Sequence, residues 1–256
     1  FLGRALLPSS IYNKTYEADY KVDTVIPAVG FLTIVLPVHV KMFCKILAGT
    51  KVTSSGDSKI PYTVKDNYYI SQDGDNNYTV TSYDGSTGEV NAVSFKEEIR
   101  SNQVCIVFNI KVQQVEYFSY EIVFENPSVY TFYEEVLGGY TGQIHDMVVV
   151  IEGERYYEID SIYQARSEDR VYEMIMNTLN NTVTLKFGNG IYGYQPKANY
   201  VGNVLITTSF GEKGNVTAKQ LMLNSKVMNL ATGSEIKVLS YNTQPIKNGV
   251  DVVTID

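Results

Sequence analysis

Hydrophobic and polar residues alternate along much of this chain, which is the pattern of a β-strand with one buried face. The two longest alternations place every second side chain on one face: Val38, Val40, Met42, Cys44 and Ile46 in the first, and Val104, Ile106, Phe108, Ile110 and Val112 in the second. Residues 117–124 continue the pattern as far as Asn126 and Pro127. Each of these stretches predicts a strand.

Turn residues between apolar stretches predict hairpins. Residues 147–151 and 156–159 flank the turn sequence Glu152–Arg155, so we expect them to pair. Two tyrosine-rich strands are expected within 62–83, on either side of the Asp- and Asn-rich cluster at 73–77.

Two other segments are less regular. Residues 167–179 fit either a helix capped by Ser167 or a strand, and we favour a strand that turns at Asn180 and Asn181 into another beginning near Val183. Residues 94–100 are expected to form a short helix or an irregular bend.

The composition agrees with a fold made of strands. The chain has 256 residues, including 21 Tyr and 10 Phe, and aromatic and β-branched residues favour strands. The connections are too short for the helical crossovers of parallel α/β folds. We therefore predict a mainly β (β-rich α+β) fold, an elongated multi-domain chain of small antiparallel β modules with few short helices.

Charge and cysteine content exclude several classes of function. The net charge of −7 argues against a nucleic-acid partner, which would need a basic surface. The apolar run at 29–38 is shorter than the roughly 18 residues that span a bilayer, so no membrane insertion is expected. Cys44 and Cys105 lack metal-binding spacing, and we interpret them as buried free thiols, with a disulfide as the alternative. Because the chain starts at Phe1 without Met, we expect it to be a segment of a larger polypeptide.

One glycine motif has two possible meanings. Gly188, Gly190 and Gly193 match the G-x-G-x-x-G of dinucleotide-binding proteins, in which a helix N-terminus holds the pyrophosphate. Here Pro196 follows so closely that no helix can begin in the right place. We favour a structural turn whose glycines adopt positive φ, and we expect no cofactor.

A calcium-binding loop is formally possible but not favoured. Asp73, Asp75, Asn77 and Asp84 occupy positions 1, 3, 5 and 12 of the calcium-loop pattern, but Tyr78 stands where that loop needs glycine. We therefore predict an ordinary β-turn and no metal site.

Candidate catalytic residues are scarce. His39 and His145 are the only histidines, and neither has zinc-ligand spacing. The adjacent pairs Glu97–Glu98 and Glu134–Glu135 would point to opposite faces of a strand, so they are poor candidates for the facing carboxylates of a glycosidase. We predict that the chain is not an enzyme and has no catalytic residues.

The most specific pattern lies within 183–215. A strand runs into Phe187-Gly-Asn-Gly-Ile-Tyr-Gly193, a proline follows, a second strand comes next, and Gly211-Glu-Lys-Gly-Asn215 closes the segment. This order resembles the signature of the baseplate J-like wedge proteins of contractile-tailed phages and related contractile injection systems. The resemblance identifies a structural motif, in which Asn189 replaces a commoner Asp, made of Phe187, Gly188, Asn189, Gly190, Gly193, Pro196, Gly211, Gly214 and Asn215.

Flanking segments extend the resemblance. Residues 148–162 resemble the family's strand and acidic-glycine turn, and 166–173 resemble its segment with Asp169 before Val-Tyr. Residues 245–251 resemble the start of its next region, with Asn248 in place of the first glycine. The specific match covers 146–215.

The predicted organisation follows from this match. It consists of an N-terminal arm at 1–20, a β-rich domain at 21–140 in which 61–140 is interpreted as an insertion, a β domain at 141–241 that carries the motif, and a connection at 242–256.

The resemblance implies a structural component of the baseplate wedge. Such a subunit self-associates as a homodimer or ring and binds other wedge and hub proteins around the tail hub. Its location is the virion, in the tail baseplate, after assembly in the host cytoplasm. The alternatives are a tail-associated glycan-binding or receptor-binding β module and, with less support, a cell-wall glycan hydrolase; the absence of Trp and the scarcity of His weigh against both.

Overall fold

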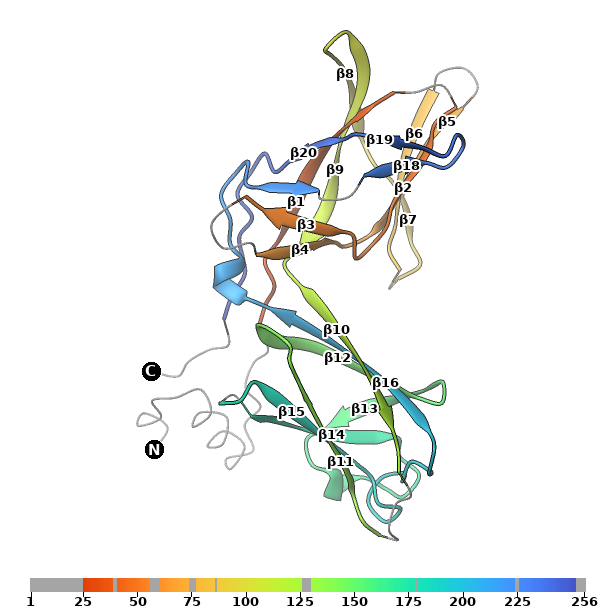
Figure 1. Ribbon diagram of the computed structural model, residues 1–256, viewed down its shortest axis with the longest axis vertical. Coiled ribbons are helices and arrows are strands. Elements are labelled where there is room, and N and C mark those ends of the chain that lie inside the picture. The colour runs from red at the N-terminus through yellow and green to blue at the C-terminus, as the bar shows by residue number, and fades with distance from the viewer. Residues whose placement is uncertain are drawn as a thin grey trace. The chain divides into compact units, whose positions relative to one another are not determined.

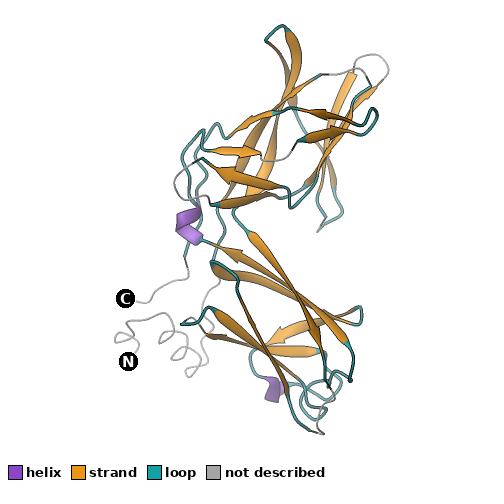
Figure 2. Ribbon diagram, in the orientation of Figure 1, coloured by secondary structure: helices purple, strands orange, loops and turns teal. Residues whose placement is uncertain are grey.

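The computed structural model describes residues 25–38, 41–55, 60–73, 77–85, 87–125, 130–177, 179–223 and 226–251. More than half of these residues lie in strands, and no helix among them reaches seven residues; Figure 2 shows the strands in orange. This confirms the predicted mainly β class. No helix in the described ranges is both long and apolar enough to span a bilayer.

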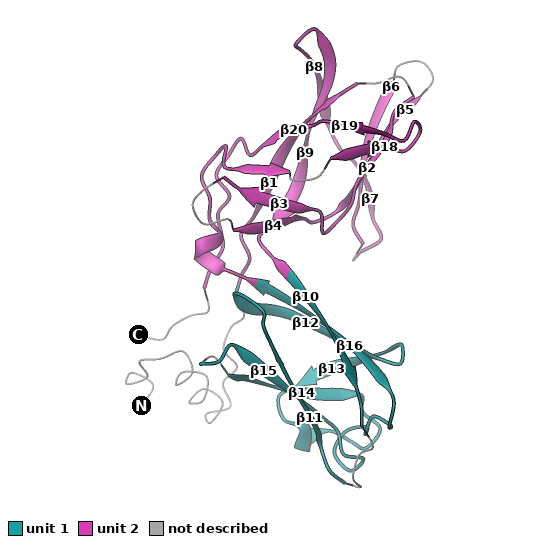
Figure 3. Ribbon diagram, viewed as in Figure 1, with its two compact units in different colours: residues 1–25, 117–208, 252–256 teal, residues 26–116, 209–251 magenta. Residues whose placement is uncertain are grey.

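The chain divides into two compact units (Figure 3). Unit 1 contains residues 1–25, 117–208 and 252–256, and unit 2 contains residues 26–116 and 209–251. Unit 2 is therefore built from two segments that are separated in sequence by most of unit 1.

Unit 2 contains two sheets (Figure 1). The first has the order β17-β3-β4-β9-β1-β20, and β8 also pairs with β9. Its strands are β17 (Leu221–Leu223), β3 (Lys51–Ser54), β4 (Pro61–Val64), β9 (Gln103–Gln113), β1 (Val29–Pro37), β20 (Leu239–Tyr241) and β8 (Phe95–Arg100). The Leu223 N–H donates to Ser240 Oγ at 2.7 Å, which joins β17 to β20 and closes the sheet on itself.

The second sheet of unit 2 has the order β19-β18-β2-β5-β6-β7. Its strands are β19 (Ser234–Ile236), β18 (Val227–Asn229), β2 (Phe43–Ile46), β5 (Asn67–Asp73), β6 (Asn77–Tyr83) and β7 (Val90–Ala92). β5 and β6 are the predicted tyrosine-rich hairpin, with Asp73 opposite Asn77.

The core of unit 2 follows the predicted alternation in part. Of the strand expected over 38–46, only Phe43–Ile46 forms one, as β2, because the chain turns at Lys41, whose φ is 58°. Val38 is only half-buried. Cys44 and Ile46 are buried in β2, and Ile106, Phe108, Ile110 and Val112 are buried in β9. Val104 has the same parity but is 41% exposed. β1 pairs with β9 only as far as Cys105, so Val104 lies past the end of that pairing.

The prediction of a helix or bend at 94–100 is wrong. These residues contain β8, which pairs antiparallel with β9 from Phe95 opposite Phe108 to Arg100 opposite Gln103. The two turn residues, Ser101 and Asn102, both have positive φ (49° and 61°). Two such residues in succession form the tight turn whose twist suits a hairpin, so the local turn geometry favours the strand.

Unit 1 is one sheet with the order β10-β16-β12-β13-β14-β15-β11. Its strands are β10 (Glu116–Val123), β16 (Val201–Ser209), β12 (Gln143–Ile151), β13 (Glu154–Ile159), β14 (Val171–Asn177), β15 (Thr182–Phe187) and β11 (Tyr133–Gly138). Tyr120 in β10 donates its hydroxyl proton to the Gly138 carbonyl at 3.0 Å, which links the two outer strands.

Both hairpins predicted in unit 1 are confirmed. β12 and β13 turn through Glu152 and Gly153, both with positive φ, and β14 turns into β15 rather than forming a helix. β13 and β14 pair in parallel, through a connection that contains the short 3-10 helix η2 (Ile162–Gln164). This parallel pair is an exception in a sheet expected to be antiparallel.

Phe187, at the end of β15, is completely buried among aromatic rings. Its ring centroid lies 5.2 Å from that of Phe124, 6.1 Å from that of Tyr156 and 6.3 Å from that of Tyr172. The first residue of the sequence motif is therefore the centre of the aromatic core of unit 1.

The continuous segments predicted from the sequence, 21–140 and 141–241, do not coincide with the two units. The reason is long-range pairing: β17, β18 and β20 come from the end of the chain but pair with β3, β2 and β1. The predicted arm at 1–20, residues 252–256 of the connection, His39, Val40 and Asp75 lie outside the described residues.

Candidate functional site

The motif residues form two clusters, one in each unit. We call residues 187–196 together with 166–169 the first corner, which belongs to unit 1. We call residues 209–215 together with Gln114 and 248–251 the second corner, which belongs to unit 2. The motif that reads as one signature in the sequence is thus two separate structures.

The first corner reverses the chain after β15 by a close approach of two glycine backbones. A Cβ atom added to Gly188 would lie 2.2 Å from the carbonyl carbon of Gly193, so only glycine fits there. Gly190 and Gly193 have φ of 86° and 75°, values that residues with a Cβ atom rarely adopt. The Gly190 N–H donates to the Gly193 carbonyl at 3.0 Å.

Asn189 holds this turn with its side-chain amide. Its Oδ1 accepts hydrogen bonds from the N–H groups of Ile191 and Tyr192 at 3.0 and 2.9 Å. Its Nδ2 donates to the Tyr130 carbonyl at 3.1 Å. The side chain is 6% exposed, so these backbone partners compensate for its burial.

Segment 166–169 completes the first corner. The Gly193 N–H donates to the Arg166 carbonyl at 3.1 Å, and the Tyr194 N–H donates to the Asp169 carbonyl at 2.8 Å. Asp169 also accepts from the Arg166 N–H through Oδ2 at 2.8 Å. Two stretches that the resemblance identified separately are therefore bonded to each other, and the buried ring of Pro196 follows them.

The second corner joins the 3-10 helix η3 (Gly211–Gly214) to the end of the described chain. Asn215 exchanges two hydrogen bonds with Gly249: Nδ2 donates to the Gly249 carbonyl at 3.2 Å, and the Gly249 N–H donates to Oδ1 at 3.0 Å. A Cβ on Gly249 would lie 2.2 Å from the Gly211 carbonyl oxygen. Asp251 Oδ1 accepts from the Glu212 N–H at 3.1 Å.

Gln114 is the buried centre of the second corner. Its Oε1 accepts from Ser209 Oγ and from the Phe210 N–H, each at 2.7 Å. Its own N–H donates to the Ala28 carbonyl at 2.8 Å. Sequence reasoning missed Gln114, because a glutamine among strand residues carries no signal of partners 95 positions away.

The second corner lies beside several of the points at which the chain leaves unit 2. Within the described residues these points fall at 25/26, 116/117 and 208/209. Ile26 and Val250 exchange backbone hydrogen bonds of 2.9 and 3.0 Å, and Gln114 bonds to Ser209. At these three points the chain leaves unit 2 from residues that are bonded within or beside this cluster.

The remaining candidates for chemistry are not brought together. His145 has Nδ1 2.8 Å from the Val25 carbonyl oxygen, and within the described ranges no three His, Cys, Asp or Glu residues form a group that could hold a metal ion. Cys44 and Cys105 are buried free thiols, as predicted. Burial raises the pKa of Cys44 to about 11, so this thiol stays protonated and unreactive at neutral pH.

An aromatic cluster lies near the first corner, on the surface of unit 1. Lys186 Nζ is 4.3 Å from the ring centroid of Phe132 and 4.9 Å from that of Tyr163. The Tyr163 ring lies 5.4 Å from that of Tyr192 at 71°. Tyr163 and Tyr192 are exposed, so their rings are available to a partner.

No protein-family model, curated protein or solved structure matches this chain.

Proposed function

We propose that this chain is a structural, non-catalytic subunit of the baseplate wedge in a contractile tail or related injection system. In this role it self-associates and binds other wedge and hub proteins around the tail hub. The proposal is supported by the sequence resemblance in 146–215 and by one geometric observation. Asn189 and Asn215, the polar residues of the motif, direct their amides at backbone groups of the two corners.

This use of the motif suits a part that must keep its shape under force. A turn of closely packed glycine backbones, with side-chain amides that are fully hydrogen-bonded, has few alternative conformations. A movement of its backbone would break several hydrogen bonds together. The second corner joins residues from both segments of unit 2. Force applied to either unit would thus act on a hydrogen-bonded corner that resists rearrangement.

Immunogold labelling of intact particles tests the proposal. Antibodies raised against the purified chain are applied to extended and contracted particles, and label is scored along the tail by electron microscopy. We expect label at the baseplate, in several copies per particle, and none with antibody absorbed by the purified chain. Label confined to fibre tips, or particles of normal composition without this chain, would contradict the proposal.

One observation favours the alternative of a glycan-binding module. The exposed rings of Tyr163 and Tyr192 lie edge to face beside Lys186, and aromatic faces with a polar end suit mixed surfaces. Binding of the purified chain to host-surface polysaccharide, lost in Tyr163→Ala with Tyr192→Ala, would support this function. Tyr117→Ala, at an exposed tyrosine of β10, is the matched control.

A further inference from the structure

The hairpin of β8 and β9 carries an apolar tip. Ile99 and Val104 lie opposite each other near the turn, and they are 78% and 41% exposed. They share a face with Ile106 and Phe108, which are buried in unit 2. The apolar stripe of the core thus continues onto a part of the hairpin that no other strand covers.

Glu97 lies on the same face, two residues before Ile99, and is exposed. We call Glu97, Ile99 and Val104 the finger. Apolar residues exposed singly are common on protein surfaces, whereas contiguous exposed apolar residues are typical of contact sites. The finger therefore combines an aliphatic knob with one carboxylate.

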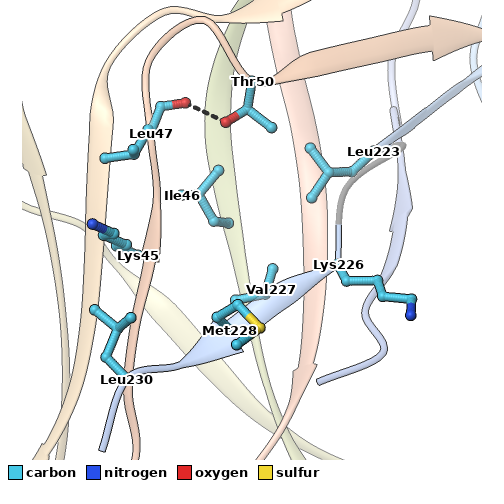
Figure 4. Close-up of a pocket in the computed structure, with 9 residues that line it drawn as sticks. All are labelled: Lys45, Ile46, Leu47, Thr50, Leu223, Lys226, Val227, Met228 and Leu230. Carbon is cyan, nitrogen blue, oxygen red and sulfur yellow. Dashed lines mark hydrogen bonds between the residues drawn. The ribbon is translucent and has the colours of Figure 1, made fainter. Parts of the chain in front are cut away.

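A second feature of unit 2 has the complementary properties. A hollow of about 210 Å³ has a wall formed by Ile46, Leu47, Leu223, Val227, Met228 and Leu230, and Figure 4 shows how these side chains lie. Leu47, Met228 and Leu230 are exposed, so the hollow opens to solvent. Lys45 and Lys226 lie on opposite sides of it (Figure 4), and Lys226 pairs with Glu235.

The finger and the hollow match in size and in charge. An apolar cavity of about 150 Å³ is large enough to admit a benzene molecule, so the hollow has room for a branched aliphatic side chain. Lys45 at its rim would meet a carboxylate favourably. Ile99 does not line the hollow of its own copy.

We propose that the finger of one copy of this chain inserts Ile99 into the hollow of a second copy and brings Glu97 beside Lys45. The inference deepens the proposed function, because it names a contact through which the subunit self-associates. The two surfaces differ, so the contact is head-to-tail, and repeated contacts of this kind close into rings or extend as filaments.

Cysteine trapping between differently tagged full-length chains tests the contact. One chain carries Ile99→Cys, the other carries Met228→Cys, and they are mixed at up to about 1 mM, where even a contact with a Kd near 1 mM is substantially populated. We expect a disulfide-linked heterodimer after mild oxidation. Val136→Cys, an exposed position in unit 1, replaces Ile99→Cys in the control and should give only background.

Charge exchange tests the same contact without cross-linking. Glu97→Lys and Lys45→Glu should each weaken self-association in sedimentation by roughly two- to fivefold, and the chain with both changes should recover it. Ile99→Ser should weaken self-association by about tenfold or more, because the buried aliphatic group is lost. Each variant's far-ultraviolet circular dichroism should match the parent's.

Three results would overturn the proposal. They are a heterodimer yield no greater than that of the control, preferential linkage of Ile99→Cys to itself, and self-association that Ile99→Ser leaves unchanged. These results are distinguishable from failure of the proposed function. A chain that labels the baseplate but gives no trapped heterodimer keeps its role and loses this contact.

Discussion

The two corners use the same residue types, but the first joins residues of one continuous stretch and the second joins residues of two separate segments. In the first corner Asn189 bonds to Tyr130, 59 positions away, and both belong to the continuous stretch 117–208. In the second corner Gln114 bonds to Ser209, 95 positions away, and the Tyr62 hydroxyl donates to the Gly214 carbonyl, 152 positions away. The first corner thus lies in a unit made mainly from one stretch of chain. The second corner joins the two separate segments that make up unit 2.

The comparison implies that the units differ in whether one stretch of chain can fold on its own. Apart from its ends, unit 1 comes from one stretch of chain, so its core residues are all present in that stretch. Unit 2 takes core residues such as Leu221, Val227 and Ile236 from the segment after unit 1. Its first segment alone lacks the strands that complete both of its sheets.

The largest expected effect therefore comes from dividing the chain. A fragment of residues 117–208 should fold cooperatively, and a fragment of residues 26–116 should not. Thermal unfolding followed by circular dichroism and amide dispersion in NMR spectra would measure this. Cooperative folding of 26–116, or a disordered 117–208, would reverse the comparison.

Next in size is the effect of adding a methyl group at a close backbone contact. Gly188→Ala should destabilise unit 1 by about 4 kcal/mol or more, because the new Cβ would collide with the Gly193 backbone. Gly190→Ala is the matched control, since its Cβ would have its nearest neighbour at 3.7 Å. This substitution should lower the free energy of unfolding by only about 1–2 kcal/mol, the cost of a left-handed backbone conformation for a residue with a Cβ.

Gly249→Ala extends this test to the second corner, where the new Cβ would meet the Gly211 carbonyl oxygen. Hydrogen exchange should show loss of protection in unit 1 for Gly188→Ala and in unit 2 for Gly249→Ala. Equal loss in both units from either variant would show that the corners are not separate structures.

A smaller effect concerns buried tyrosines. Burial raises the pKa of Tyr156 to about 12, above the value near 10 of an unfolded chain. Below about pH 10 both states keep the proton; between about pH 10 and 12 the unfolded state releases it first, so stability falls as pH rises. The loss from this group should approach about 2–3 kcal/mol near pH 12.

Urea unfolding at about pH 9 and about pH 11 measures this loss. Tyr156→Phe should reduce the difference in the free energy of unfolding between the two pH values. Tyr157→Phe, at an exposed position beside it, is the control and should leave that difference unchanged. An identical pH dependence in Tyr156→Phe and the parent would contradict the assignment.

The smallest effects should come from the two asparagines. Asn189→Asp retains the acceptor for Ile191 and Tyr192 but replaces the donor to Tyr130 with a carboxylate oxygen that faces the Tyr130 carbonyl, so it should cost about 2 kcal/mol. Asn215→Ala loses both bonds to Gly249 and should cost about 2 kcal/mol. Urea unfolding measures both, and no loss of stability from either variant would contradict the bonds assigned to the two asparagines.

The sequence predicted what local geometry determines. The turns at Glu152–Gly153 and at Asn180–Asn181 lie between apolar runs, and both hairpins form. The hairpin at Ser101–Asn102 was missed because it has no glycine, and because Phe95 and Ile99 are also spaced as on a helix. A turn can therefore be predicted from the sequence only where it contains residues typical of turns.

The partners of the second corner could not be predicted. Their contacts depend on how strands from both ends of unit 2 pair, and no spacing in the sequence specifies that pairing. The glycines were identified as structural, but the reason for Gly188 is close backbone approach rather than positive φ. The exposure of Val104 likewise depends on where β1 ends, a tertiary fact.

An electron-microscopic reconstruction of the intact tail end tests the central claim most directly. The account predicts density for both β units of this chain in several copies around the tail hub. It also predicts that the β8–β9 hairpin of each copy contacts a neighbouring copy. A reconstruction that accounts for every baseplate subunit without these two units would contradict it.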